Sequence, residues 1–252
     1  MIALTRDVSP GINACELTHL AREPIDVQRA TEQHRRYEEL LQELGCEVHR
    51  VAAAPELPDG VFVEDTAIVL DEIAVITRPG AESRRAETGA VAAAMAAYRG
   101  VVSVIAPGTL DGGDVLRVGR ALYVRISARS NVEGASQLAR LTGRYGYSVH
   151  QVEVTGCLHL KSAVTEVADG TLLHNPAWVD RGAFDGLELI EVDPSEPFGA
   201  NALRVGSAVV YATAWDRTRR RLERRGIHTT PVDASELAKA EAGVTCCSLI
   251  FR

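Results

Sequence analysis

The sequence lacks the features that mark several classes of protein. No window comes near the roughly 18 uninterrupted apolar residues of a membrane helix, and the first ten residues lack a basic flank followed by an apolar core. We therefore expect neither a membrane protein nor a secreted one. Neither a GxGxxG fingerprint nor a phosphate-binding loop occurs, so no nucleotide signature is present.

Cysteine is sparse and odd in number. The five cysteines include no CxxC pair, and their spacings suggest no disulfide framework, which indicates a reducing cytoplasm. The seven histidines are scattered without the spacing of metal ligands. We expect no structural metal and no cofactor.

The charge balance is acidic, with 27 Lys and Arg against 34 Asp and Glu, a net charge of −7. Nucleic acid is therefore not expected as the main partner, and the basic stretch 217–225 is interpreted as the solvated face of a helix. The 252 residues are 46% hydrophobic, which is ample for a buried core. Because no Pro/Gly/Ser-rich linker interrupts them, we expect one domain over 1–252.

Four long helices are expected, and each ends at a glycine that suits a left-handed C-cap. Their ranges are 26–45, 83–100, 130–146 and 216–226. The third opens with an apparent capping box, Ser130 with Glu133. A short strand-like run follows each glycine, at 46–52, 101–107, 147–154 and 227–233.

Five further apolar runs recur at regular spacing. Taking Asp65, Asp114, Ser162, Asn201 and Cys247 as marks, the intervals are 49, 48, 39 and 46 residues. Another strand closely follows each of the first four runs, so the unit is strand, strand, helix, strand. The third unit has only a short helix near 178–184, and the fifth is divided between the two chain ends.

Five units that cannot bury their own surface favour a closed ring. We predict an α/β fold, a five-bladed α/β-propeller of repeated ββαβ units with pseudo-fivefold symmetry. Sharing the last unit between the termini would close the ring without a sheet edge. The alternative is a doubly wound parallel sheet, which also alternates strands and helices.

Polar residues stand at the same place in each unit, so a ring would bring them together near its axis. They are Glu64, Asp65, Asp111, Asp114, His159, Asn201, Cys246 and Cys247. Carboxylates, an imidazole and a thiol together are typical of nucleophilic catalysis.

Within this set Cys246 is the candidate thiol and His159 the candidate imidazole, and Asp111 would orient and charge-stabilise the imidazole as the third member of a triad does. A lone cysteine is more often inert packing, and a lone histidine is often a satisfied core residue. Cys246 differs because the following residues already supply the apolar strand, which leaves it at the mouth of the ring. Cys247 would begin that strand and is interpreted as structural.

Glu64 and Asp65 are consecutive carboxylates in an otherwise apolar run, 61–70. Buried carboxylates without partners are costly, so a cation should meet at least one of them. It could be an arginine or lysine of the protein, or a cationic substrate. The surplus of acidic groups favours a guanidinium or an amine substrate.

Six motifs resemble those of one known family. They are FVED, LDGGDVL, LHLKS and GVTCCS, with ITRPGAESRR and SARSN, and they occur in the family's order over Leu17 to Phe251. The sequence is similar to the dimethylarginine dimethylaminohydrolases, of the guanidine-modifying superfamily with the five-bladed α/β-propeller fold. Arginine deiminases and amidinotransferases share this fold but are generally longer.

The resemblance implies roles for particular residues. It implies Cys246 as nucleophile, His159 as general acid and base, and Asp111 as its supporting acid. It further implies that Asp65 binds the guanidinium of the substrate, with Glu64 and Asp59 as further contacts. Arg84 and Arg129 would hold the amino-acid end. Leu17 and Ala240 would also contact the substrate. Relatives carry a larger branched residue where this chain has Ala240, and some of them lack the second cysteine, Cys247.

The two arginines also make sense without the resemblance. Each lies at or just before an expected helix start, and a helix N-terminus with an arginine suits a carboxylate group. The alternative for each is a solvated surface arginine, which their matching positions in consecutive units disfavour.

The expected activity is hydrolysis of N-methylated L-arginine to L-citrulline and dimethylamine or methylamine, through a cysteine-bound thiouronium. The alternatives are an arginine deiminase, an amidinotransferase, or a catalytically silent binding protein on the same ring. We expect a small cationic arginine-like partner, no nucleic acid, no membrane, and a monomer or homodimer.

Overall fold

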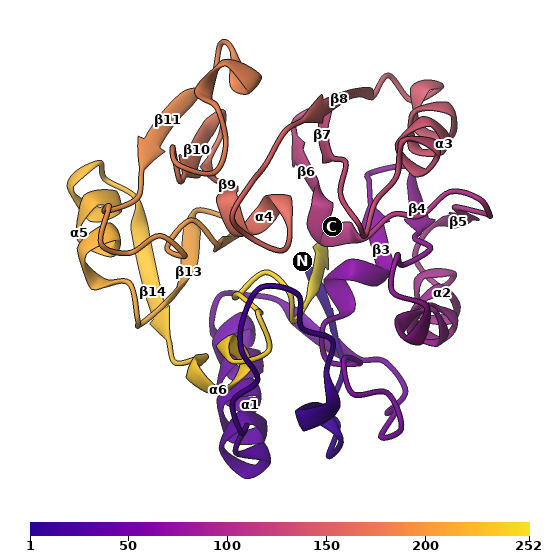
Figure 1. Ribbon diagram of the computed structural model, residues 1–252, viewed down its shortest axis with the longest axis horizontal. Helices are drawn as coiled ribbons and strands as arrows, with labels where there is room; N and C mark the ends of the chain where they lie inside the picture. The colour runs from indigo at the N-terminus through magenta and orange to yellow at the C-terminus, as the bar shows by residue number, and fades with distance from the viewer.

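The computed structural model describes all residues, 1–252, and its strands form five separate three-stranded sheets set in a ring (Figure 1). In each sheet the first strand pairs antiparallel with the second, and the second pairs parallel with the third. The first two sheets are β3 (Ala67–Val69), β4 (Ile73–Ile76) and β5 (Gly100–Ser103), then β6 (Val115–Val118), β7 (Ala121–Arg125) and β8 (Ser148–Val152). The next two are β9 (Val164–Ala168), β10 (Thr171–His174) and β11 (Glu188–Glu191), then β12 (Ala202–Val205), β13 (Ala208–Ala212) and β14 (His228–Val232).

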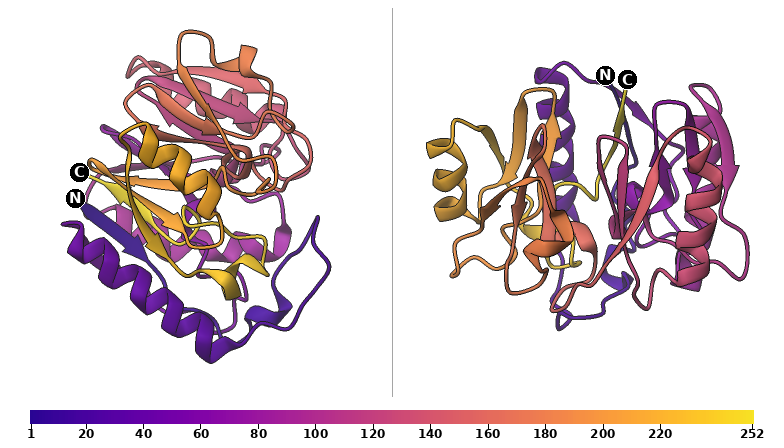
Figure 2. Two further views of the ribbon diagram at one scale, coloured as in Figure 1. Left: turned by 90° about the vertical axis from the view of Figure 1, so that its left-hand side faces the viewer. Right: turned by 90° about the horizontal axis from the view of Figure 1, so that it is seen from above.

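The fifth sheet joins the two ends of the chain. It comprises β15 (Leu249–Phe251), β1 (Ile2–Thr5) and β2 (Glu47–Arg50). The strand β15 runs antiparallel to β1, with Phe251 opposite Ile2, and both termini lie on the same side of the molecule (Figure 2). The predicted ring of five units, closed by pairing the terminal strands, is confirmed.

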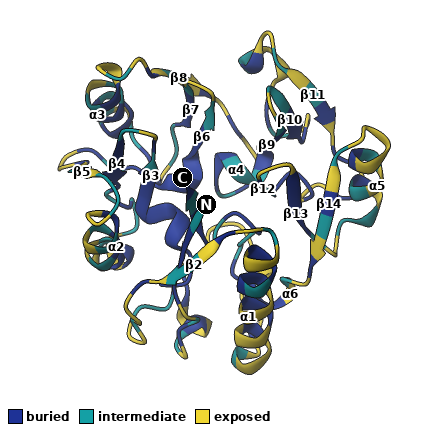
Figure 3. Cartoon of the chain, turned by 180° about the vertical axis from the view of Figure 1, so that it is seen from behind, coloured by how far each residue is buried: buried dark blue, intermediate teal, exposed yellow.

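Four helices lie on the outside of the ring, each between the second and third strands of a sheet (Figure 1). They are α1 (Val27–Glu43), α2 (Thr88–Met95), α3 (Val132–Gly143) and α5 (Asp216–Arg224). The third sheet has only the 3₁₀ helix η5 (Arg181–Phe184) at this place, as expected. Exposed residues concentrate on the outward faces of these helices and on the outermost strands, such as β2 and β14, while the inner strands are mostly buried (Figure 3).

The helix α1 illustrates why these residues form these elements. Asp26 is its N-cap, and its side chain accepts from the amide of Arg29. Tyr37, Leu40 and Leu41 are buried on one face, as the i, i+3, i+4 spacing predicts. Such a face packs the helix on its sheet and leaves the charged face in solvent.

Two details of the helix ends differ from expectation. The N-cap of α3 is Asn131, whose side chain accepts from the amide of Gly134, so the predicted capping box at Ser130 is wrong. The hydroxyl of Ser130 instead donates to the carboxylate of Asp114. A left-handed glycine follows α1, α3 and α5, at Gly45, Gly146 and Gly226, but α2 ends at Met95 and Gly100 already belongs to β5.

Short helical turns precede the innermost strands and face the axis of the ring. They are η2 (Val63–Thr66) before β3, η4 (Gly112–Asp114) before β6, and α4 (Leu160–Ala163) before β9. The turn η2 contacts η4, and η4 contacts α4, so the polar residues of successive units meet there. No helix is both long enough and apolar enough to cross a membrane.

Candidate active site

His159 lies at the N-terminus of α4 between two buried carboxylates. Its Nε2 is 3.2 Å from Oδ2 of Asp111, and its Nδ1 is 3.8 Å from Oδ1 of Asp65. Burial alone would lower the pKa of the imidazole, but Asp65 and Asp111 outweigh that effect and raise the pKa to about 9. His159 therefore carries a proton at neutral pH and is able to donate it.

Cys246 is half-buried in the turn between α6 (Ser235–Ala238) and β15. Burial raises the pKa of its thiol well above the ordinary value, and the carboxylates of Glu64 and Asp65 raise it further. The amide of Gly243, 3.3 Å from Sγ, acts in the opposite direction but does not offset them. In the free protein Cys246 is thus a neutral thiol at neutral pH. Cys247 is buried in the same turn, two residues before β15, and does not begin the strand as predicted.

Asp65 is paired with an arginine of the protein. The Nη1 of Arg84 donates to Oδ2 of Asp65 at 2.6 Å, and the same guanidinium donates from Nε and Nη2 to Glu87 at 3.0 and 2.8 Å. Burial opposes ionisation of Asp65, but His159 and Arg84 together hold the pKa of that carboxyl well below its usual range. Asp65 therefore stays ionised, and Arg84 is a buried structural cation, not a solvated one.

Glu64 is also paired within the protein. Its Oε1 accepts from Nζ of Lys161 at 2.6 Å, and its Oε2 accepts from Oγ1 of Thr245 at 2.7 Å. Its side chain lines a separate cavity of about 240 Å³, although its amide donates to the carbonyl of Cys246. Glu64 and Asp65 are thus both paired with a cation of the protein, Lys161 and Arg84 respectively. This is one of the two alternatives that the sequence left open, the other being a cationic substrate.

Arg129 and Asp59 connect the site to the segment that follows η1 (Ile12–Ala14). Arg129 is 8% exposed, with Nη1 3.8 Å from Oδ2 of Asp111 and Nη2 donating to Oγ1 of Thr18 at 3.3 Å. Asp59 accepts from the amide of Glu16 at 3.1 and 3.3 Å, and burial raises the pKa of its carboxyl. The alternative of a solvated surface arginine does not hold for Arg129.

Two glycines allow the turns of the site to approach one another. A Cβ on Gly113 would lie 2.6 Å from Nδ1 of His159, and a Cβ on Gly112 would lie 2.0 Å from the carbonyl oxygen of Glu64. Neither residue has a positive φ. Their role is therefore close approach, and not a special backbone conformation.

A small cavity of about 20 Å³ brings most of the predicted residues together. Those lining it are Asp59, Asp65, Arg84, Arg129, His159, Ala240 and Cys246. Asp111 lies behind His159, while Glu64 and Leu17 do not line the cavity. The geometry thus combines the thiol of Cys246, the protonated imidazole of His159 and the ionised carboxylate of Asp65 in one place.

Several residues of the site escaped sequence reasoning. Glu87 pairs with Arg84, and Lys161 pairs with Glu64. Glu16 and Glu241 line the cavity. Glu87 could have been found because it stands three residues after Arg84 on a helical turn. The others come from different units, and their contacts depend on the folded ring.

Asp65, Asp111 and His159 also place one potential metal-ligand atom each within 4.8 Å of one another. Both carboxylates already have partners, since Asp65 binds Arg84 and the amide of Gly113, and Asp111 accepts from the amide of Gly80. With the guanidinium of Arg84 2.6 Å from Asp65, the surroundings suit a protonated histidine better than a dication.

Comparison with known proteins gives a consistent result, although no family model matches the chain. The chain is 40% identical over 252 residues to a dimethylarginine dimethylaminohydrolase of Streptomyces coelicolor, covering 99% of this chain and 96% of that protein. It is 36% identical over 228 residues to the enzyme of the same name from Pseudomonas aeruginosa, covering 90% of each. A solved structure of that enzyme, a cysteine-to-serine variant with bound citrulline, superposes with a TM-score of 0.94 at 32% identity, covering 99% of this chain and 98% of that one. Identity of this extent, together with the shared ring, shows that the chain belongs to the dimethylarginine dimethylaminohydrolase family.

Proposed function

We propose that the protein hydrolyses N-methylated L-arginine to L-citrulline, releasing dimethylamine or methylamine. The observation that carries this proposal is the single cavity containing Cys246, protonated His159 and ionised Asp65. The names of two relatives, and the citrulline bound in the solved structure of one of them, support the choice of substrate.

In the proposed complex Asp65 binds the guanidinium of the substrate. Its pairing with Arg84 keeps it ionised, so it can bind the planar cation by charge-assisted hydrogen bonds. Arg129 also lines the cavity and would bind the substrate carboxylate. Arg84, whose guanidinium is held by Asp65 and Glu87, would act on the substrate through Asp65. Asp59 and Leu17 would contact the amino-acid end, and Ala240 would border the substrate chain.

The bound cation also supplies the activation that Cys246 lacks in the free protein. A guanidinium beside the sulfur lowers the pKa of the thiol, as does protonated His159. The thiol proton then leaves to water, and the resulting thiolate attacks the central carbon of the guanidinium. A tetrahedral adduct forms, with a new bond between sulfur and carbon.

His159 then donates its proton to the departing nitrogen, and the bond from carbon to that nitrogen breaks. The amine leaves, and a thiouronium remains on Cys246. Neutral His159 next takes a proton from water, whose oxygen attacks the same carbon. The bond from carbon to sulfur breaks, which releases the ureido product and the cysteine, and Asp111 stabilises the imidazolium in both steps.

We further propose that the protein works in a reducing cytoplasm as a monomer or homodimer, without a cofactor. The five cysteines are all free, and four of them are buried, which supports a reducing compartment.

The test is to incubate purified protein with asymmetric dimethylarginine, monomethylarginine and arginine, and to quantify ureido product and released amine. Citrulline with an equimolar methylated amine, and little product from arginine, is the expected result. Turnover of arginine alone would contradict the proposal in favour of a deiminase. Transfer of the amidino group only when an acceptor amine is present would assign an amidinotransferase.

A second test addresses the nucleophile. The Cys246→Ser variant should lose turnover by about 10⁴-fold or more, because a serine hydroxyl is not ionised in this setting. Cys247→Ser is the matched control and should retain activity. Substantial activity of the first variant would overturn the assignment of Cys246.

A further inference from the structure

Asn201 is the polar residue that the fourth unit contributes near the axis of the ring. It directly precedes β12, at the place where the first two units carry Asp65 and Asp114. Its side chain is buried, with 6% of the residue exposed, and the mechanism proposed above gives it no role. Its contacts therefore have to explain why a polar side chain is buried at this point.

The side chain of Asn201 joins the two elements that carry the reacting groups. Its Oδ1 accepts from the amide of Thr245 at 3.1 Å, and its Nδ2 donates to Oγ1 of Thr245 at 3.0 Å. The same Nδ2 donates to the carbonyl of Lys161 at 3.0 Å. Thr245 directly precedes Cys246, and Lys161 lies in α4 two residues after His159. One amide group thus links the turn that holds the thiol to the helix that holds the imidazole.

Asn201 also packs against Gly243, in the same turn as the thiol. A Cβ on Gly243 would lie 2.3 Å from Cγ and Oδ1 of Asn201 and 2.8 Å from its Nδ2. Gly243 has no positive φ, so close approach is the reason for a glycine here. The amide of Gly243 donates to Sγ of Cys246 at 3.3 Å. The place of Asn201 therefore also determines where this N–H meets the sulfur.

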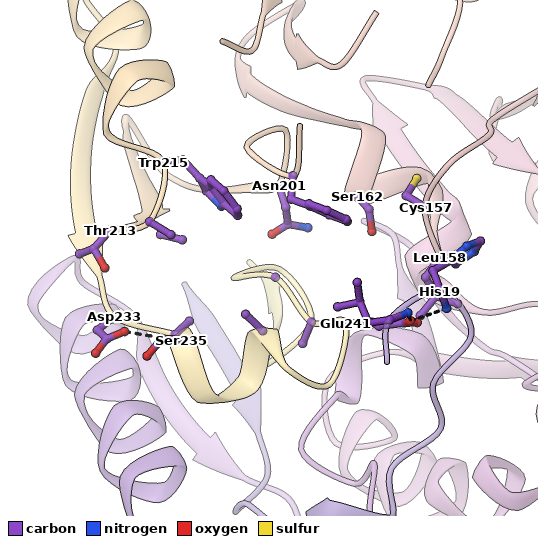
Figure 4. A pocket seen from close by; sticks show the side chains of 18 of the residues that line it. His19, Cys157, Leu158, Ser162, Asn201, Thr213, Trp215, Asp233, Ser235 and Glu241 are labelled. Atoms are coloured by element: carbon purple, nitrogen blue, oxygen red, sulfur yellow. Dashed lines mark hydrogen bonds between the residues drawn. The ribbon is translucent and has the colours of Figure 1, made fainter. Parts of the chain in front are cut away.

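Asn201 does not line the cavity of about 20 Å³ in which the thiol and the imidazole meet. It lies instead on the wall of a neighbouring cavity of about 510 Å³, which Trp215 also lines (Figure 4). That cavity is large enough to hold water. A shorter side chain at position 201 would therefore leave the amide of Thr245 with a water as partner, so truncation releases the turn without leaving a buried donor unpaired.

We propose that Asn201 is a positioning residue that sets the sulfur of Cys246 against His159, and so raises kcat without contacting the substrate. The reaction itself rests on the function proposed above. Glu64 spans Lys161 and Thr245 through their side chains, whereas Asn201 binds a backbone carbonyl and a backbone amide. Backbone contacts fix the two elements themselves, and a misplacement of about 1 Å between reacting groups can cost about 100-fold in rate.

The experiment compares Asn201→Ala with Asn175→Ala, a matched control. Asn175 is also a buried asparagine that bridges a carbonyl and an amide. Its Nδ2 donates to the carbonyl of Pro197 at 2.9 Å, and its Oδ1 accepts from the amide of Ala177 at 2.9 Å. Values of kcat and KM are measured with the best methylated arginine. Hydrogen exchange of the Gly243 amide and Tm are measured without ligand.

We expect Asn201→Ala to lower kcat by about 10- to 100-fold. The value of KM should change by less than about threefold, because Asn201 does not line the cavity of the reacting groups. The amide of Gly243, which Asn201 does not bind, should exchange at least about 10-fold faster because the turn is released. Asn175→Ala should lower Tm by a similar amount but keep the kcat and the Gly243 exchange of the wild type.

Gly243→Ala is a second variant that disturbs the same contact and keeps Asn201. Its Cβ would meet three atoms of Asn201, so the turn must shift, and kcat should again fall by about 10-fold or more. Asn201→Ala removes those three atoms. The double variant should therefore have nearly the kcat of Asn201→Ala, and not the product of the two losses.

An unchanged kcat in Asn201→Ala or in Gly243→Ala would overturn the proposal, and so would a loss that appears in KM. An equal loss of kcat in Asn175→Ala, or losses that multiply in the double variant, would assign Asn201 a merely structural role. If the wild type turned over none of the guanidines, the proposed function would fail. The exchange of the Gly243 amide would still decide whether Asn201 holds the turn.

Discussion

His159 shows how pairing decides the chemistry of a single side chain. Sequence reasoning placed His159 and Asp111 at equivalent points of the repeat, and the structure sets their side chains 3.2 Å apart. It could not foresee that Asp65 would approach the other ring nitrogen at 3.8 Å. That second carboxylate is the main reason that the pKa of His159 is raised and not lowered by burial.

We predict a titration of His159 with a midpoint near pH 9 in the free protein, followed by NMR of labelled imidazole nitrogens. Asp111→Asn should lower this midpoint because it removes one of the three carboxylates that favour the charged form, the others being Asp65 and Asp114. Asp71→Asn, at an exposed carboxylate paired with Arg117, is the control and should leave it unchanged. A midpoint below the usual value of about 6.5 in the wild type would contradict the assignment.

The same shift has a consequence for stability. The folded-state pKa of about 9 lies above the unfolded value, so protonated His159 stabilises the fold fully below about pH 6.5. This contribution declines as pH rises towards 9. The stability that wild type gains over His159→Gln in urea unfolding should therefore shrink between these two pH values.

At the scale of elements, buried charge joins the turn η2 to the 3₁₀ helix η3 (Glu82–Glu87) that leads into α2. Arg84 lies in η3 and is 3% exposed, bridging Asp65 of η2 and Glu87. Arg85, the next residue, pairs with exposed Glu82 and keeps 30% of its side chain in solvent. Neighbouring arginines thus have opposite environments in one short element.

We predict that Arg84→Gln destabilises the protein by about 3–5 kcal/mol, because two buried carboxylates lose their shared cation. Arg85→Gln should cost less than about 1 kcal/mol, as for exposed ion pairs. Urea unfolding of both variants measures the difference. Equal effects would mean that the buried network contributes no more than a surface pair.

The start of α3 shows where sequence reasoning about elements failed. The pattern of Ser130 and Glu133 fits a capping box, but Ser130 donates to Asp114 and its Oγ accepts from the amide of Asp111. The N-cap of α3 is instead Asn131, whose Oδ1 accepts hydrogen bonds from the amides of Gly134 and Thr109. A long-range partner therefore displaced a local motif, and nothing in the local sequence reveals that partner.

We predict that Asn131→Ala costs about 1–2 kcal/mol of stability, because it leaves these amides without an acceptor. Glu133→Ala should cost less than about 0.5 kcal/mol, since Glu133 is only half-buried and its carboxylate contacts only Arg140 and Gln137 at the helix surface. Thermal unfolding of both variants would show the order. A larger loss of stability for Glu133→Ala than for Asn131→Ala would instead support a capping box formed by Ser130 and Glu133.

At the scale of the whole molecule, the regular spacing of the five repeated apolar runs was enough to predict the ring. The repeat of 39 to 49 residues can be recognised even where a unit differs in local detail, as in the third unit, which has only a 3₁₀ helix. The site was less accessible from sequence because its contacts cross between units. Lys161 reaches Glu64, and Glu241 reaches the segment after η1, over separations of 97 and more than 200 residues.

The ring makes a circular permutant feasible, because the two chain ends lie in neighbouring strands of one sheet. We predict that joining residue 252 to residue 1 by a short Gly/Ser linker, with new ends between Asp169 and Gly170, preserves the fold. The value of kcat/KM should stay within about threefold, since the opened turn is exposed and in another sheet. Loss of cooperative unfolding in the permutant would contradict this.

The pairing of β1 with β15 also sets the order in which the protein can mature. During synthesis β1 emerges before every other strand of the ring and β15 after all of them. One edge of β1 can pair with β2 early, but the other edge must wait for β15. Cys246 stands three residues before β15 and reaches His159 only when this last strand docks. A nascent chain therefore exposes the thiol of Cys246 and one open edge of β1 until synthesis of the ring is finished, and catalytic competence arises in one late step.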